Sequence, residues 1–232
     1  MTKACSASNV RQGFGVVAAL GIALFSLGRA RPACAQTAQS GTEATLPPPA
    51  SVEYFQYGVA LHTLTLLESG SVCPKDATTP CIVGSGGGLG LRLGYRTRGP
   101  IYLGAGYQLS RLNSSNLLRL AILQRLSAEG RYYFYRGKRL TPYLMAGLGV
   151  AFYGNEWTAD AIGIAPSLAV GLEYELSERT VVALVPAYQP AVFRHFTDTT
   201  GQERADELLG FGLAHWLAIQ IVFELRDPMA RW

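Results

Sequence analysis

Large apolar residues alternate with small or polar residues over most of the chain after residue 50. A period of two indicates β-strands, because successive side chains of a strand point to opposite faces. In the first such segment Phe55, Tyr57, Val59 and Leu61 fall on one face, and Gln56 to His62 alternate with them on the other. The pattern predicts eight strands, at about residues 55–62, 88–96, 102–110, 118–135, 143–153, 167–175, 180–189 and 216–224. The alternation is least regular in the seventh, which contains Pro186.

The two faces of these segments differ in an unusual way. One face is large and apolar, and the other is mostly Gly, Ala, Ser and Gln with a few charges. The second face has too few charges for a solvated exterior and is too small for an ordinary core. Both faces are explained if the apolar one contacts lipid and the small one lines a narrow lumen. We therefore expect an all-β fold, an eight-stranded antiparallel transmembrane β-barrel with up-and-down topology, which leaves no strand edge unpaired in hydrocarbon.

The connections between the expected strands support this topology. They cover about residues 68–83, 97–100, 111–116, 136–141, 154–161, 177–179 and 190–207, and the odd-numbered ones are mostly the longer. Outer-membrane barrels have long external loops and short periplasmic turns. The N-terminus is therefore expected on the periplasmic side.

The N-terminal segment resembles a secretory signal peptide. Lys3 and Arg11 precede an apolar run over 14–27, and the small-residue cleavage pattern Ala33-Cys34-Ala35 follows. The alternatives are an uncleaved anchor or a lipoprotein modified at Cys34. The sequence thus divides into a signal peptide (1–35), a polar and Pro-containing linker (36–50), the barrel (51–225) and a C-terminal tail (226–232).

Removing residues 1–35 changes the charge and cysteine content. The segment holds four of the 20 basic residues and no acidic one, so 20 − 4 = 16 basic residues balance 16 acidic ones. No basic surface for nucleic acid is left. Cys73 and Cys81 remain, in the first external loop. In an exported chain such a close pair predicts a disulfide, and a metal site, the alternative, lacks further ligands nearby.

Three segments resemble the outer membrane protein β-barrel domain family, whose members are small eight-stranded barrels similar to OmpA, OmpX and OmpW. They are RYYFYRGKRLTPYLMAGLGVAFYG (131–154), GSGGGLGLRLGYR (84–96) and APSLAVGLEYEL (165–176). The resemblance covers about residues 51–225. It implies an outer-membrane location, contact with outer-membrane lipid and insertion by the outer-membrane assembly machinery. The family's terminal aromatic residue would correspond to Phe223 or Trp232.

Several charged residues fall on the lumen face, in the periplasmic half of the barrel. We expect them to form buried ion pairs that fill the lumen, which is narrow in a barrel of eight strands. The alternative is a wet lumen mouth where they contribute little. The residues of this expected cluster are Arg92, Arg96, Glu129, Arg131, Glu173, Glu175 and Glu224.

No catalytic, metal or cofactor site is expected. A lipid A deacylase would need a Ser activated by a nearby His, and none of His62, His195 and His215 has a Ser two residues later. His215 and Trp216 are expected in an interfacial aromatic belt. We expect a monomeric, non-enzymatic protein with a structural or interaction role or passage of small solutes. The alternatives are a lipid A-modifying enzyme and a soluble lipocalin-like barrel.

Overall fold

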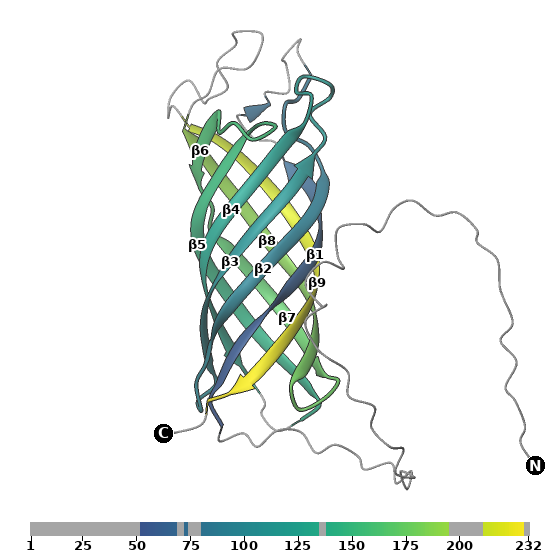
Figure 1. Cartoon of the computed structure of the whole chain (residues 1–232). Coiled ribbons are helices and arrows are strands. Elements are labelled where there is room, and N and C mark those ends of the chain that lie inside the picture. Colours follow the sequence, from purple (N-terminus) through teal and green to yellow (C-terminus); the bar gives the residue numbers. More distant parts are fainter. Residues whose placement is uncertain (1–51, 69–71, 74–79, 135–137, 195–210, 230–232) are drawn as a thin grey trace, which may run out of the picture. The chain divides into compact units, whose positions relative to one another are not determined.

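The computed structural model describes residues 52–68, 72–73, 80–134, 138–194 and 211–229. The expected signal peptide and linker, His195 and Trp232 lie outside these ranges. The described part is all β, with strands β1 (Tyr54–Glu68), β2 (Gly86–Arg96), β3 (Ile101–Leu112), β4 (Ala121–Tyr133), β5 (Leu140–Asn155), β6 (Ala161–Ile164), β7 (Ser167–Glu175), β8 (Thr180–Arg194) and β9 (Phe211–Pro228). The strands are tilted against the barrel axis (Figure 1).

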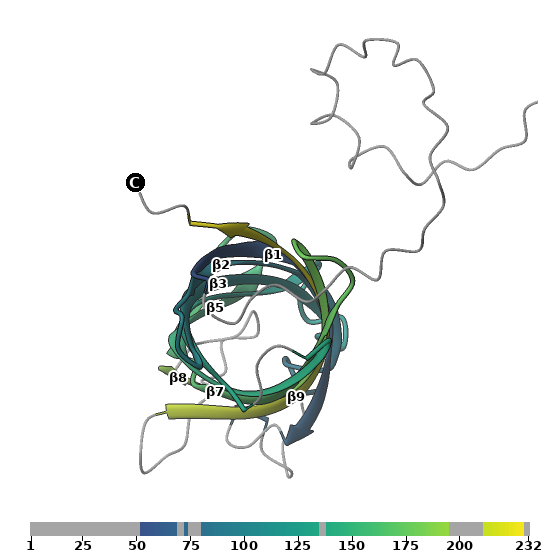
Figure 2. The same cartoon turned by 90° about the horizontal axis from the view of Figure 1, so that it is seen from below.

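All neighbouring strands are antiparallel, and the sheet closes on itself between β1 and β9. The short β6 and the longer β7 both lie between β5 and β8, so they are two halves of one strand, interrupted at Ala165 and Pro166. Nine elements therefore make an eight-stranded ring, which Figure 2 shows from below. The expected eight-stranded antiparallel barrel is confirmed.

The apolar face points outward. Val59, Leu91, Leu103, Leu148 and Leu168 keep 52–62% of their surface exposed, whereas Gly, Ala and polar residues between them face the lumen. Such a wall is stable only against hydrocarbon, because water would meet a continuous apolar surface. A soluble lipocalin-like barrel would bury this face, so that alternative is wrong.

The connections differ at the two ends of the barrel. At the turn end, the described strands lead into the connections 97–100, 134–139 and 176–179, and β1 begins and β9 ends there. At the other end, the mouth, the strands lead into the connections 69–85, 113–120, 156–160 and 195–210. Three of the four mouth connections are longer than every turn, as expected, and 156–160 is the exception.

Several strands are longer or shorter than expected, and two of the differences have an evident cause. The last strand runs on to Pro228, because Arg226 pairs with Gln56 of β1 and its side chain is held inside the lumen. It therefore does not begin a tail. The fourth strand begins only at Ala121, because residues 113–120 form a tight connection in which Ser115 and Asn116 have positive φ.

Candidate functional site: the closed lumen

Ion pairs fill part of the lumen in the turn-end half of the barrel. Arg131 donates hydrogen bonds to both carboxylate oxygens of Glu224, at 2.7 and 2.9 Å, and to Glu129 at 2.7 Å. Gln56 donates to Glu224 at 2.5 Å, and the Arg92 guanidinium lies 3.7 Å from Glu129. These side chains are almost completely buried. We call this group of five residues the central lattice.

A second group lies nearer the turn end and is called the rim lattice. Arg226 donates to Glu173 and, at 2.6 Å, to Glu175. Glu173 also accepts from Arg96 at 3.0 Å and from the Tyr133 hydroxyl at 3.1 Å. Glu173 is fully buried. Its charge is therefore tolerated only because two guanidinium groups and a hydroxyl surround it.

Aromatic rings complete the filling of the turn-end half. The Arg131 guanidinium lies over the ring of Tyr102, 4.2 Å from its centroid, and the Arg96 guanidinium lies over Tyr133 at 3.8 Å. Tyr143 covers Gly171, where an added Cβ would overlap the tyrosine ring. The glycines on the lumen face thus make room for rings that lie flat against the wall.

All seven charged residues that the sequence singled out face the lumen, and the two lattices include every one of them. Sequence reasoning missed Arg226 and the uncharged partner Gln56. Arg226 has the same parity as Glu224, so the alternation already placed it on the lumen face. The expected end of the strand concealed it.

Arg125 was also missed, and it explains how the barrel tolerates an interrupted strand. Its guanidinium donates to the carbonyls of Ala165 and Pro166, at 3.2 and 3.1 Å, and to Gln189 at 2.6 Å. These carbonyls lie between β6 and β7, where Pro166 has no backbone N–H to donate. Arg125 makes no ion pair within the described ranges, so its bonds to the wall hold it in place.

The structure brings together one His–Ser pair that the sequence did not place. His62 Nε2 of β1 lies 2.7 Å from Ser110 Oγ of β3, and both side chains are buried in the lumen. His62 Nδ1 has no hydrogen-bond partner among the described residues. The pair therefore lacks the third group that orients the His in a nucleophilic triad.

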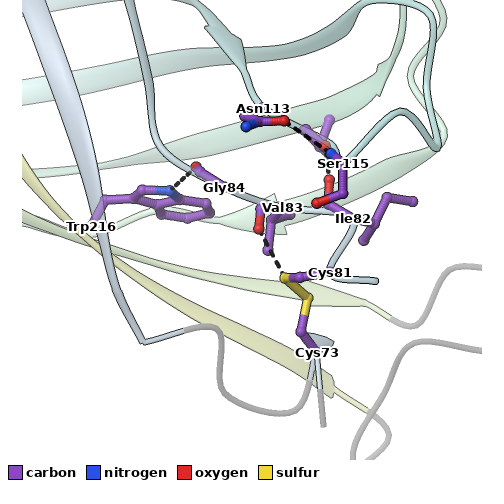
Figure 3. The surroundings of a disulfide bond; sticks show 9 residues. Cys73, Cys81, Ile82, Val83, Gly84, Asn113, Ser115 and Trp216 are labelled. Carbon is purple, nitrogen blue, oxygen red and sulfur yellow. Dashed lines mark hydrogen bonds between the residues drawn. A yellow bond between two sulfur atoms is a disulfide. The ribbon is translucent and has the colours of Figure 1, made fainter. Parts of the chain in front are cut away.

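Part of the first long connection lies inside the mouth. Cys73 and Cys81 are joined by a disulfide, and Val72, Ile82 and Val83 beside it are buried (Figure 3). We call residues 72–73 and 81–84 the mouth plug. Its backbone is held by the barrel wall at two points, because Ile82 and Gly84 accept hydrogen bonds through their carbonyl oxygens. Their donors are the Tyr153 hydroxyl at 2.5 Å and the Trp216 indole at 3.1 Å.

Trp216 was expected in an interfacial belt, and this was wrong. Its ring is buried inside the mouth, in edge contact with Phe193, whereas its neighbour His215 lies on the outer wall. Adjacent residues of a strand point to opposite faces. Only His215 can therefore face the membrane.

Within the described ranges, no group of three or more His, Cys, Asp and Glu side chains is arranged to hold a metal ion. The same part of the chain contains no helix that is long and apolar enough to cross a membrane.

No family model and no curated protein matches the chain. Several solved structures match the chain. Outer membrane protein OprG from Pseudomonas aeruginosa is 14% identical with a TM-score of 0.50, and the match covers 76% of this chain and 97% of OprG. Neisserial surface protein A is 17% identical with a TM-score of 0.44 and the same two coverages. E. coli outer membrane protein W is 14% identical with a TM-score of 0.42, covering 76% and 99%. The similarity to OprG, with the closed ring and the outward apolar wall, shows that the chain has the fold of the small outer-membrane β-barrel proteins.

Proposed function

We propose that the chain is an exported, monomeric outer-membrane barrel with a structural or interaction role in the cell envelope, rather than an open pore or an enzyme. Residues 1–35 direct export and are removed. The barrel is then inserted by the outer-membrane assembly machinery and contacts outer-membrane lipid. The turn end faces the periplasm and the mouth faces outward, as in other barrels with short turns on the periplasmic side.

The observation that carries this proposal is that the lumen is filled at both ends. The central and rim lattices occupy the turn-end half, and the mouth plug occupies the other end. Passage of solutes would require both to move. Moving a lattice residue would separate buried charges, which costs several kcal/mol per ion. The surfaces left for function are the outer wall and the external loops.

Planar-bilayer recording of the folded chain, residues 36–232, tests the closed lumen. We expect no stepwise conductance in the wild type. Matched variants are Arg131→Ala, which opens the central lattice, and Arg119→Ala, which removes an exposed ion pair with Glu156. Large, regular conductance steps in the wild type would contradict a closed barrel and favour passage of small solutes.

Location needs its own experiment. We expect a band in outer-membrane fractions whose migration on SDS gels changes with boiling, and Gln36 as the first residue of the exported chain. Recovery from the soluble periplasm without a heat shift would contradict the proposal.

The enzymatic alternative depends on His62 and Ser110. Both face the lumen, so lipid in the membrane cannot reach them without entering the barrel. Mass spectrometry of lipid A from cells that express the wild type or Ser110→Ala tests this alternative. We expect identical lipid A in both; loss of acyl chains with the wild type alone would establish a deacylase.

A further inference from the structure

The outer wall is hollowed on the side formed by β5, β7, β8 and β9. A groove of about 230 Å³ lies there, lined almost entirely by apolar atoms. Its walls include Leu144, Leu168, Val170, Pro186, Tyr188 and Leu217. The groove is part of the outward apolar wall, so the medium that meets it is the hydrocarbon of the membrane.

Pro186 accounts for the hollow. The β7–β8 ladder pairs Ala169 with Ala187 and resumes only at Leu172 and Leu184, so the stretch opposite Pro186 is unpaired. Proline has no N–H to donate to a ladder and has a compact ring. The backbone at Ala169 and Ala187, whose side chains point into the lumen, forms the floor of the groove.

A polar pair stands at one end of the groove. The Tyr188 hydroxyl lies 2.5 Å from His215 Nδ1, and the two rings are stacked with an angle of 14° between them. His215 is opposite Pro190 in β8, whereas Leu217 is opposite Tyr188, so His215 lies nearer the mouth than the groove does. The outward residues below it on β9, from Leu217 to Leu225, are apolar.

We propose that this groove binds one lipid of the outer leaflet, with an acyl chain in the groove and the polar head beside His215. The inference is based on the order of the polar pair and the apolar groove along the wall, from the mouth toward the turn end. An outer-leaflet lipid has its head toward the mouth and its chain toward the middle of the membrane, and the polar pair and the groove follow the same order. An inner-leaflet lipid would have the reverse order. The inference rests on the outer-membrane location proposed above.

The polar pair defines the chemistry of the head. When the Tyr188 hydroxyl donates to Nδ1, the imidazole proton lies on Nε2. The described residues make no hydrogen bond to Nε2, which then serves as a donor to a phosphate or ester oxygen of the lipid. Such a bond is stronger at the edge of hydrocarbon than in water. A phosphorylated, acylated glycolipid supplies both kinds of acceptor.

Native mass spectrometry of the folded chain in detergent tests the site, with lipid A added as the probe and phosphatidylethanolamine in a parallel arm. The groove-filling variant is Val170→Trp. Its matched control is Leu91→Trp, because Leu91 is equally exposed on the wall, at 58% against 57% for Val170, and lies on β2 outside the groove. The head-group variants are Tyr188→Phe and His215→Leu.

We expect Val170→Trp to lower the population carrying one lipid A by roughly tenfold, which corresponds to about 1.4 kcal/mol, and Leu91→Trp to leave it unchanged. His215→Leu should lower the population of protein that carries one lipid A, because the Nε2 donor to a phosphate or ester oxygen is lost. Equal retention in Val170→Trp and Leu91→Trp would overturn the site, as would the absence of a retained lipid in the wild type. Heat-modifiable migration of each variant in outer-membrane fractions reports location separately, so loss of lipid with a normal heat shift counts against the groove alone.

Discussion

Arg131 and Glu224 are joined by two hydrogen bonds across the lumen, although they lie 93 positions apart in the chain. Arg131 comes from β4 and Glu224 from β9, on well-separated parts of the ring. The pair therefore ties together strands that share no backbone ladder. Glu129 accepts from Arg131 and also lies 3.7 Å from the Arg92 guanidinium, so two guanidinium groups compensate the charges of the two buried carboxylates.

Replacing Arg131 by Ala should destabilise the barrel strongly. Glu129 and Glu224 would remain buried without their main cation, and breaking a buried pair in this way costs about 3–5 kcal/mol. Urea unfolding in detergent micelles, followed by the heat-modifiable shift, measures the loss. Arg119→Ala is the control, because the Arg119 side chain is 87% exposed and its pair with Glu156 is worth about 0–1 kcal/mol. Equal urea midpoints of unfolding for Arg131→Ala and Arg119→Ala would show that the central lattice does not stabilise the barrel.

Gly171→Ala should destabilise the barrel through a clash. The Cβ would overlap the Tyr143 ring, which must then leave its position against the wall. Overpacking of this kind costs about 1–3 kcal/mol. Gly130→Ala is the matched control, because its Cβ would meet nothing closer than 3.7 Å on the outer face. The same urea titration compares them, and a stable Gly171→Ala would mean that the ring can shift freely in the lumen.

These lattice residues show what a sequence can and cannot reveal. The alternation of Leu89, Leu91 and Leu93 with Gly90 and Arg92 was enough to predict the barrel and its inverted faces. Parity also placed the seven charged residues in the lumen, since it depends only on local strand geometry. The partners depend on register across the closed ring, which no local pattern encodes.

The parts that sequence reasoning missed have physical reasons. Trp216 was assigned to the membrane surface by residue type, but its parity with Ala218 and Gln220 places it inside the mouth. Arg125 donates to the carbonyls of a strand interruption at Ala165 and Pro166. Pro166 was the available signal for the interruption, but no local pattern shows which side chain bonds to these carbonyls. The mouth plug forms because a connection folds back into the barrel. Apolar residues such as Ile82 and Val83 in an otherwise polar loop were the available signal.

An arginine on the outer wall should be costly in proportion to its depth. Leu91 lies in the middle of β2 and Ile101 begins β3 at the turn end, and both point outward. Leu91→Arg should lower the free energy of unfolding by about 2–4 kcal/mol, and Ile101→Arg by about 0–1 kcal/mol. Urea unfolding in liposomes gives both values. If Ile101→Arg were the more damaging, the membrane would be centred elsewhere on the wall.

Reducing the disulfide should loosen the mouth plug without unfolding the barrel. Cys73 and Cys81 are separated by eight positions, and closing so short a loop is worth about 2.5 kcal/mol in the chain-entropy model. The wall itself is held by ladders that do not involve these residues.

Trp216 reports the change in the plug, because its indole donates to Gly84 of the plug and is buried beneath it. In a Trp157→Phe, Trp232→Phe background, we expect its fluorescence to shift to longer wavelength on reduction and to become quenchable by iodide. The Cys73→Ser, Cys81→Ser variant should show the shifted spectrum without reductant and should not respond to it. Because the heat-modifiable band measures the barrel separately, an unchanged spectrum with a fully reduced pair would mean that packing of Val72, Ile82 and Val83 alone keeps the mouth closed.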